Sequence, residues 1–390
     1  VAVALLVVTR AVLTSGQEPG PAEPQTFDGD PTRAQIREAA RSVGLEYSDA
    51  ELALLMGEFG QNLAHLRTLR ARILDNSVAP ATGFTPLIAG VTARLGEVVG
   101  AAHPVPDVQR PDDLADLYFA GIDTLSALIR AREVTCVELT ELFLARLRAV
   151  DEQLHCVITY TEERALAQAR DLDAELERGQ WRGPLHGIPW GAKDLLATRG
   201  ARTTWGARPF EEQRLDVDAS VVSRLDDAGA VLVAKLSLGA LAWGDVWFDE
   251  RTRNPWNPEQ GSSGSSAGPA SAVAAGALPF ALGSETLGSI VSPSARCGNS
   301  SLRPTFGRVS RHGAMALAWT LDKLGPMCRS LRDASLVMAA IDGVDPLDDF
   351  TVESVPFVAP PQVDPSTLRG GIVESAFRGN DGAVPVIARL

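Results

Sequence analysis

From about residue 118 onward, short apolar runs alternate with amphipathic stretches, and this alternation constrains the fold more than any other feature. Four runs have the length and composition of strands, at 156–160, 187–195, 230–238 and 278–285. Helical patterns precede and separate them, including 124–151, which breaks near Val134, and the highly charged 161–179. Such an alternation favours an α/β domain in which helices cover both faces of a sheet.

The residues before this region predict a separate helical appendage. Segment 30–45 has Pro31 near a helix start, and in segment 48–74 Ser48 and Glu51 have the spacing of a capping box. We expect an N-terminal helical appendage with its connector over 31–112 and the main domain over 118–390.

The first 30 residues combine an apolar start with a linker rich in proline and glycine. The apolar run at 1–8 is too short to span a bilayer, so no stable membrane insertion is expected. It could be the remnant of a signal peptide, which leaves the location open between cytoplasmic and exported.

Composition excludes several classes of protein. The 390 residues carry a net charge of −13, which argues against a nucleic-acid partner. The four cysteines and five histidines are dispersed without metal-binding spacing, so neither a metal site nor a disulfide framework is expected.

The stretch GSSGSSAGPASAVAAG at 261–276 admits three interpretations. Its glycines and serines are typical of a linker, but a helical core with a suitable stop follows Pro269, and a second Gly/Ser turn follows at 283–289. Ser266 lies at the centre of a G-x-S-x-G pattern, which would make it the serine of a nucleophile elbow. The elbow requires a strand directly before it, and the two prolines of RNPWNPEQG (253–261) disfavour one.

The third interpretation depends on lysine. Only three of the 36 basic residues are lysines, at 193, 235 and 323, so a retained lysine hints at a task that arginine cannot perform. A buried ammonium group can lose its proton near neutral pH and act as a base, whereas a guanidinium group cannot. Lys193 lies in an apolar segment, and Asp194 points to the opposite face if 191–195 is extended.

Four segments together resemble the amidase signature family: GIPWGAKDL, GSSAGPASAVAAG, ALGSETLGSI, and the run 297–330. The resemblance covers about residues 118–378. It implies an α/β/α sandwich around a mixed, mostly parallel central sheet, and a Ser–cis-Ser–Lys triad. Lys193 is then the base and Ser289 the nucleophile. Alignment backward from the helix makes Ser265 the middle serine, and alignment forward from GSSG makes it Ser262; Ser265 is preferred.

The same resemblance implies an oxyanion hole formed by the backbone N–H groups of Thr286, Leu287, Gly288 and Ser289. The sequence departs from the family pattern in several places: Leu287 and Ser301 each stand where glycine is common, Glu285 stands for aspartate, and Val291 for arginine. The chain ends about 100 residues after Ser289, where relatives generally continue, so a truncated C-terminus is expected.

The activity implied is hydrolysis of a carboxylic amide through a seryl acyl-enzyme, with esters or carbamates as further substrates and no cofactor. Trp190 and Trp319 are the first candidates for contact with an apolar part of a small-molecule amide. Two alternatives stay open: the glutaminase subunit of a tRNA-dependent amidotransferase, and an inactive binding protein of the same fold. A homodimer is also left open.

Overall fold

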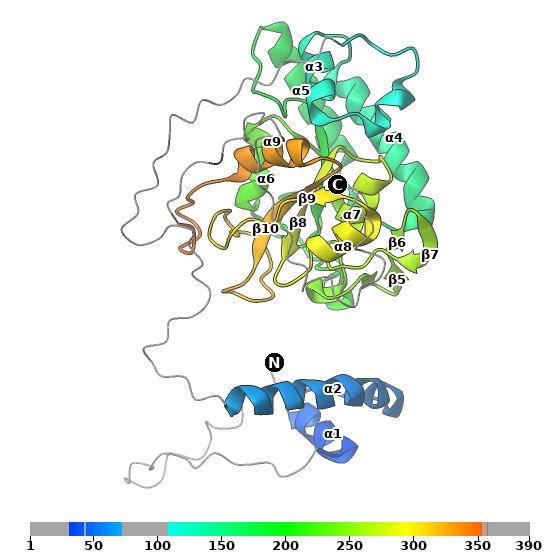
Figure 1. Cartoon of the computed structure of the whole chain (residues 1–390), viewed down its shortest axis with the longest axis vertical. Helices are drawn as coiled ribbons and strands as arrows, with labels where there is room; N and C mark the ends of the chain where they lie inside the picture. Colours follow the sequence, from blue (N-terminus) through cyan, green and yellow to red (C-terminus); the bar gives the residue numbers. More distant parts are fainter. Residues whose placement is uncertain (1–30, 43, 72–107, 353–356, 358–390) are drawn as a thin grey trace, which may run out of the picture. The chain divides into compact units, whose positions relative to one another are not determined.

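The computed structural model describes residues 31–42, 44–71, 108–352 and 357 (Figure 1). The chain divides into two compact units, residues 1–80 and 81–390. The first contains α1 (Arg33–Ser42) and α2 (Asp49–Arg70). The Ser48 hydroxyl accepts the N–H of Glu51 and the Glu51 carboxylate accepts the N–H of Ser48, so the predicted capping box is present. The apolar start, the linker and most of the connector lie outside the described residues.

The second unit is built on a six-stranded mixed sheet. Its strands, in spatial order, are β1 (Val157–Tyr160), β3 (Val231–Leu236), β2 (Pro189–Lys193), β8 (Phe280–Glu285), β10 (Lys323–Cys328) and β9 (Ser300–Ser301). The three adjacent strands β3, β2 and β8 run parallel, whereas the pairs β1–β3, β8–β10 and β10–β9 are antiparallel. The prediction of a mixed sheet is confirmed, with one correction: among the described strands, the parallel pairings are limited to this centre.

Helices lie on both sides of this sheet (Figure 1). On one side α6 and α9 pack together, and on the other α4 packs with α7 and α7 with α8. The break predicted near Val134 separates α3 from α4, where Thr135 caps α4. The helical segments of this unit are η2 (Leu114–Phe119), α3 (Ile122–Arg130), α4 (Cys136–Leu154), α5 (Glu162–Glu177), η3 (Arg208–Phe210), α6 (Ser220–Asp227), η4 (Ala240–Ala242), α7 (Ala267–Ala274), α8 (Val291–Cys297) and α9 (Leu331–Ile341).

The central strands are buried along their whole length. All residues of β2, β3 and β8 are buried, because helices cover both faces. Trp190 on β2 is fully buried and its ring stacks on Phe280 of β8, with centroids 5.9 Å apart. The structure therefore places Trp190 in the hydrophobic core, where it cannot line an open substrate pocket.

Two small hairpins precede the serine-rich loop. They are formed by β4 (Val246–Trp247) with β5 (Glu250–Arg251), and by β6 (Arg253–Asn254) with β7 (Asn257–Gly261). The expectation that no strand forms in 253–261 is therefore wrong. The strand β7 nevertheless ends at Gly261 and does not lead directly into Ser266, so the strand-to-helix turn of a nucleophile elbow is not formed.

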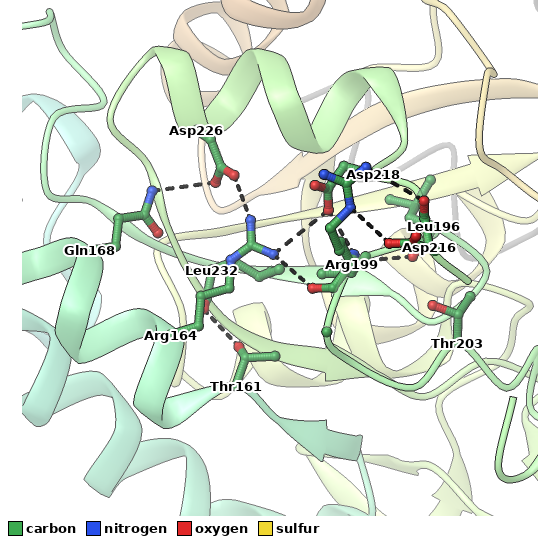
Figure 2. Close-up of polar contacts among 12 residues, drawn as sticks. Thr161, Arg164, Gln168, Leu196, Arg199, Thr203, Asp216, Asp218, Asp226 and Leu232 are labelled. Carbon is green, nitrogen blue, oxygen red and sulfur yellow. Dashed lines mark hydrogen bonds and ion pairs between the residues drawn. The ribbon is translucent and has the colours of Figure 1, made fainter. Parts of the chain in front are cut away.

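A polar network ties α5 to α6 and to the loop that follows β2 (Figure 2). Arg164 on α5 pairs with Asp226 on α6 at 2.5 Å and with Asp218 at 3.7 Å. The backbone N–H of Arg199 donates to the same Asp218 carboxylate at 2.8 Å. Within the described residues, no helix is long and apolar enough to cross a membrane.

Candidate active site

Three strand ends meet at one edge of the sheet. The parallel strands β2 and β8 end at Lys193 and Glu285, and the antiparallel strand β10 begins at Lys323, directly opposite Glu285. The N-terminus of α7 adjoins the same edge, because the N–H of Ser284 on β8 donates to the hydroxyl of Ser266 at the helix cap. Residues far apart in the sequence are thereby gathered around the Lys193 side chain.

The Lys193 side chain is fully buried and surrounded by neutral oxygen atoms. Its Nζ lies 2.8 Å from Ser265 Oγ, 2.9 Å from Ser284 Oγ and 3.1 Å from Ser266 Oγ. Burial lowers the pKa of Lys193 to about 7, although the charges of Asp322 and Glu285 act in the opposite direction. An amine with this pKa is about half neutral at pH 7, so it can accept a proton.

The adjacent carboxylate is directed away from this amine, as strand alternation predicts. Asp194 forms a fully buried ion pair with Lys235 at 2.8 Å and accepts hydrogen bonds from the N–H and hydroxyl of Thr204. Lys235 Nζ also donates to the hydroxyl of Thr203 at 2.8 Å. One buried lysine therefore has an ionic partner, and the other, Lys193, has only hydroxyl and carbonyl groups within hydrogen-bonding distance.

The serine-rich loop brings Ser265 to Lys193. The Gly264–Ser265 peptide bond is cis, and Ser265 is almost fully buried. The Ser262 hydroxyl instead donates to the carbonyl of Ser263 at 2.8 Å. Of the two candidates for the middle serine, the geometry thus places Ser265 next to the amine. Ser266 is also buried and its hydroxyl donates to the Ser284 carbonyl at 3.1 Å, so it is not presented to solvent as an elbow serine would be.

Glycine is required where β8 passes this loop. A Cβ atom on Gly283 would lie 2.7 Å from Ser266 Oγ and 2.7 Å from the sulfur of Met327. The absent side chain therefore allows β8, β10 and the serine loop to approach one another. The helix α7 begins at Ala267, two residues earlier than Pro269, where the sequence predicted it to start.

Ser289 lies beside the two buried serines. Its backbone carbonyl accepts a hydrogen bond from the N–H of Ser266 at 3.0 Å, and it is half-buried. The turn leading to it has Leu287 with 85% of its surface exposed and Gly288 with a φ of +90°. A side chain in place of that glycine would be strained, because L-residues disfavour this backbone region.

The Glu285 carboxylate organises the backbone after this turn. It accepts the N–H groups of Ile290 at 2.8 Å and Val291 at 3.0 Å, and its other oxygen lies 3.2 Å from Arg303. Burial raises the pKa of Glu285, but these backbone hydrogen bonds, one from Gly288 and the charge of Arg303 outweigh it, so the net pKa is lowered. Glu285 thus serves as an ionised acceptor for this segment.

This arrangement bears on the predicted oxyanion hole. The Gly288 N–H is directed at the Glu285 carboxylate. In the described part of the chain, the N–H groups of Thr286, Leu287 and Ser289 have no hydrogen-bond acceptor. Those three amides are therefore the candidates with a free donor for an oxyanion.

Asp322 and Lys323 hold the start of the same turn. The Thr286 hydroxyl donates to the Asp322 carboxylate, and Lys323 Nζ donates to the Thr286 carbonyl at 3.0 Å. Asp322 also accepts the N–H of Leu317 at 2.7 Å, which closes the loop that carries Trp319. The Trp319 side chain is 74% exposed.

Sequence reasoning missed two neighbours of the lysine. Ser284 and Asp322 were not singled out, although Ser284 lies two residues before Thr286 in the GSETLGS segment. No local pattern in the sequence pairs either residue with Lys193, because their proximity arises from the pairing of β2 with β8 and of β8 with β10. Among the described residues, no group of three or more His, Cys, Asp and Glu side chains is placed to hold a metal ion.

Known proteins resemble this chain over the region that forms the site. A family model described as Amidase matches residues 138–386, a span that includes β2, the serine-rich loop and the turn after β8. A glutamyl-tRNA(Gln) amidotransferase subunit from Moorella thermoacetica is 43% identical over 241 residues, covering 61% of this chain and 50% of that protein. The chain thus spans about half the length of the curated relatives it matches.

Solved structures show the same similarity. The peptide amidase from Stenotrophomonas maltophilia is 35% identical with a TM-score of 0.57, covering 65% of this chain and 51% of that one. The corresponding glutamyl-tRNA(Gln) amidotransferase subunit from Thermotoga maritima is 32% identical with a TM-score of 0.55, covering 64% of this chain and 52% of that one.

Proposed function

The chain belongs to the amidase family, and on this premise we propose that it hydrolyses the C–N bond of a carboxylic amide through a seryl acyl-enzyme. The family match confirms the resemblance carried by the four sequence segments, and the solved relatives confirm the α/β fold class. The observation that carries the proposal is the fully buried Lys193 amine, with a pKa of about 7, at 2.8 Å from Ser265 Oγ.

In the proposed first step, neutral Lys193 accepts the proton of Ser265. Ser265 in turn takes the proton of Ser289 as the Ser289 oxygen attacks the carbonyl carbon. The position of Ser289 supports this relay, because its backbone carbonyl accepts a hydrogen bond from the N–H of Ser266, the residue after Ser265. General base assistance of this kind contributes roughly 10²- to 10⁴-fold to the rate.

The same relay run in reverse protonates the leaving nitrogen. An amide nitrogen is a poor leaving group until it is protonated, so Ser265 acts as the general acid and donates its proton to that nitrogen. The amine then departs and the acyl group stays on Ser289. The oxyanion formed on the carbonyl oxygen is bound by the free N–H groups among the predicted four, those of Thr286, Leu287 and Ser289. Each such donor contributes about 3 kcal/mol in related acyl-transfer sites. Water then attacks the ester carbonyl while Ser265, relayed to Lys193, accepts a proton of the water, and the Ser289 oxygen leaves and takes a proton back from Ser265.

The substrate class is a small amide with an apolar portion. Trp319 supports this assignment, because its exposed ring is carried on a loop that Asp322 joins to Thr286. Trp190 is not kept as a substrate contact, since its side chain is enclosed in the core. Esters and carbamates also fit the proposed chemistry, because their carbonyl carbons accept a serine nucleophile in the same way.

A fluorophosphonate and a p-nitroanilide test this proposal together. Mass spectrometry of the labelled protein is expected to find the adduct on Ser289, and the p-nitroanilide is expected to give a burst of p-nitroaniline. Ser289→Ala should abolish both signals. Ser263→Ala is the matched control, because this hydroxyl lies in the serine-rich loop next to Ser265 but bonds Ser292 and not Lys193. An adduct on Ser266 would contradict the assignment, and a folded protein with neither signal would favour the inactive binding protein.

A second candidate is the glutaminase subunit of a tRNA-dependent amidotransferase. The observation that favours it is the identity of 40–46% to several proteins named as one subunit of glutamyl-tRNA(Gln) amidotransferase. The helical appendage and the net charge of −13 favour the free-standing amidase. Release of ammonia from glutamine, increased by a co-purified partner protein, would identify the second candidate, whereas hydrolysis of anilides but not glutamine would identify the first.

A further inference from the structure

The buried carboxylate of Asp322 contacts the turn that carries Ser289 and also influences the protonation of Lys193. Asp322 is 7% exposed and lies immediately before β10. Its oxygens accept the Thr286 hydroxyl and the backbone N–H groups of Leu317 at 2.7 Å and Ala318 at 3.1 Å. Within residues 108–352, no arginine or lysine forms an ion pair with it. Three hydrogen bonds, and no ionic partner, therefore satisfy this charge.

The hydrogen bonds of Asp322 fix the start of the turn that presents Ser289. Thr286 is held at its side chain by Asp322 and at its carbonyl by Lys323, two consecutive residues at the start of β10. Because β10 pairs with β8 through Lys323 and Glu285, this anchor is continuous with the sheet. The three residues between Thr286 and Ile290 are therefore tied at both ends, by Asp322 on one side and by Glu285 on the other.

The charged groups that face Lys193 are few. The charges that act on it are those of Glu285, at the end of β8, and Asp322, just before β10; neither is within hydrogen-bonding distance, and both favour the protonated form of Lys193. From β3, Lys235 is neutralised by its ion pair with Asp194. The helix α7 contains no ionisable side chain. Among the buried residues of α4 the ionisable one is Cys136, whose pKa is raised by burial so that it stays neutral.

We infer that Asp322 is a positioning residue for the proposed reaction: it holds the Ser289 turn through Thr286 and, from the same place, supplies a negative charge that acts on Lys193. The inference rests on the proposed function and extends it, because it assigns to one carboxylate both the geometry of the nucleophile and the protonation of the base. The two roles can be separated experimentally, since Asp322 positions the turn through the Thr286 hydroxyl and affects the protonation of Lys193 through its charge.

The test is the rate of fluorophosphonate labelling of Ser289 between pH 5 and 9 in three variants. In Asp322→Asn the negative charge is lost, so the protonated form of Lys193 is less favoured. The acid limb of the pH–rate profile, where labelling falls off as Lys193 gains its proton, should therefore shift by about one unit toward lower pH. In Thr286→Val the tie is lost but the charge remains, so the plateau rate should fall at least about tenfold with the limb unmoved. Asp333→Asn is the matched control, because this buried carboxylate caps Ile122 and does not face Lys193.

The outcomes separate this inference from the proposed function. If the unmodified protein does not label at Ser289, the proposed function fails. If it labels with an acid limb near pH 7 and Asp322→Asn leaves that limb in place, the inference is overturned while the function stands. An equal shift of the acid limb in Asp333→Asn would also overturn the inference, because the shift would then result from general destabilisation of the fold. Thermal unfolding of each variant confirms that the labelled protein is folded.

Discussion

Replacing Lys193 by methionine should change how the stability of the protein depends on pH. The folded protein releases the Lys193 proton near pH 7, whereas the unfolded chain holds it until about its ordinary value of 10.5. Between these values the unfolded state binds one more proton, so the free energy of unfolding rises with pH. The penalty for burying the amine is complete below pH 7 and is relieved as the pH approaches 10.5.

The size of the effect follows from the shift. Each pH unit in the window is worth about 1.4 kcal/mol, and a window of roughly three and a half units amounts to about 5 kcal/mol. The difference in unfolding free energy, wild type minus Lys193→Met, should therefore be flat below pH 7 and rise by about 1.4 kcal/mol per pH unit up to pH 10. Lys235 is present in both proteins, so its own titration cancels.

Urea unfolding followed by tryptophan fluorescence at pH 6 to 10 measures this difference. All seven tryptophans lie at residue 181 or beyond, so the signal reports the unit formed by residues 81–390. Ser265→Ala is the control, because it removes a hydrogen bond of the amine but keeps the amine, and should retain a rising stability. Parallel pH curves for wild type and Lys193→Met would refute the claim that this lysine is neutral when folded.

Three further predictions follow from the same contacts. Asp194→Asn should cost about 3–5 kcal/mol in urea unfolding, because it leaves the buried Lys235 ammonium unpaired. Gly283→Ala should lower the unfolding free energy by about 1–3 kcal/mol and slow Ser289 labelling, since its Cβ would crowd Ser266 and Met327. Trp319→Ala should raise KM for aryl amides on the order of tenfold with little change in kcat, as measured by initial rates; an equal fall in kcat would contradict a binding role.

The central strands and the helices next to them could be predicted from sequence because their signals are local. The apolar runs around Trp190, Leu232 and Phe280 form β2, β3 and β8. The capping residues Ser48 and Thr135 begin α2 and α4, because their hydroxyls accept the N–H group three residues on. Burial of Lys193 also follows from its apolar segment.

The direction of strands and the side on which a residue lies could not be predicted in this way. An apolar run does not encode whether its strand runs parallel, so the antiparallel pairing of β10 and β9 has no local signal. The sequence does not distinguish Trp190 from a pocket residue, because β2 is covered on both faces and so has no alternation of polar and apolar residues that would tell a core-facing side chain from a pocket-facing one. Pro258 disfavours a strand, yet β7 pairs with β6 only at Asn257 and Gly261, so no N–H of Pro258 is needed.

The neighbours of Lys193 were missed for a different reason. Ser284 and Asp322 are separated from Lys193 by about 90 and 130 positions in the sequence, and only the pairing of β2 with β8 and of β8 with β10 brings them together. Neither residue belongs to a local sequence motif from which its proximity to Lys193 could be predicted. Long-range register therefore decided the part of the site that local patterns left undetermined.

The contrast between the two buried lysines has a consequence for chemical modification. Amines react with electrophiles only through their unprotonated form, so the ion pair of Lys235 shields that residue while Lys193 keeps a reactive lone pair. An amine-directed electrophile that enters the serine loop should therefore modify Lys193 in preference to Lys235 near neutral pH. Modification of Lys193 would remove the base of the proposed relay, which gives inhibitor design a point of covalent attachment in addition to Ser289.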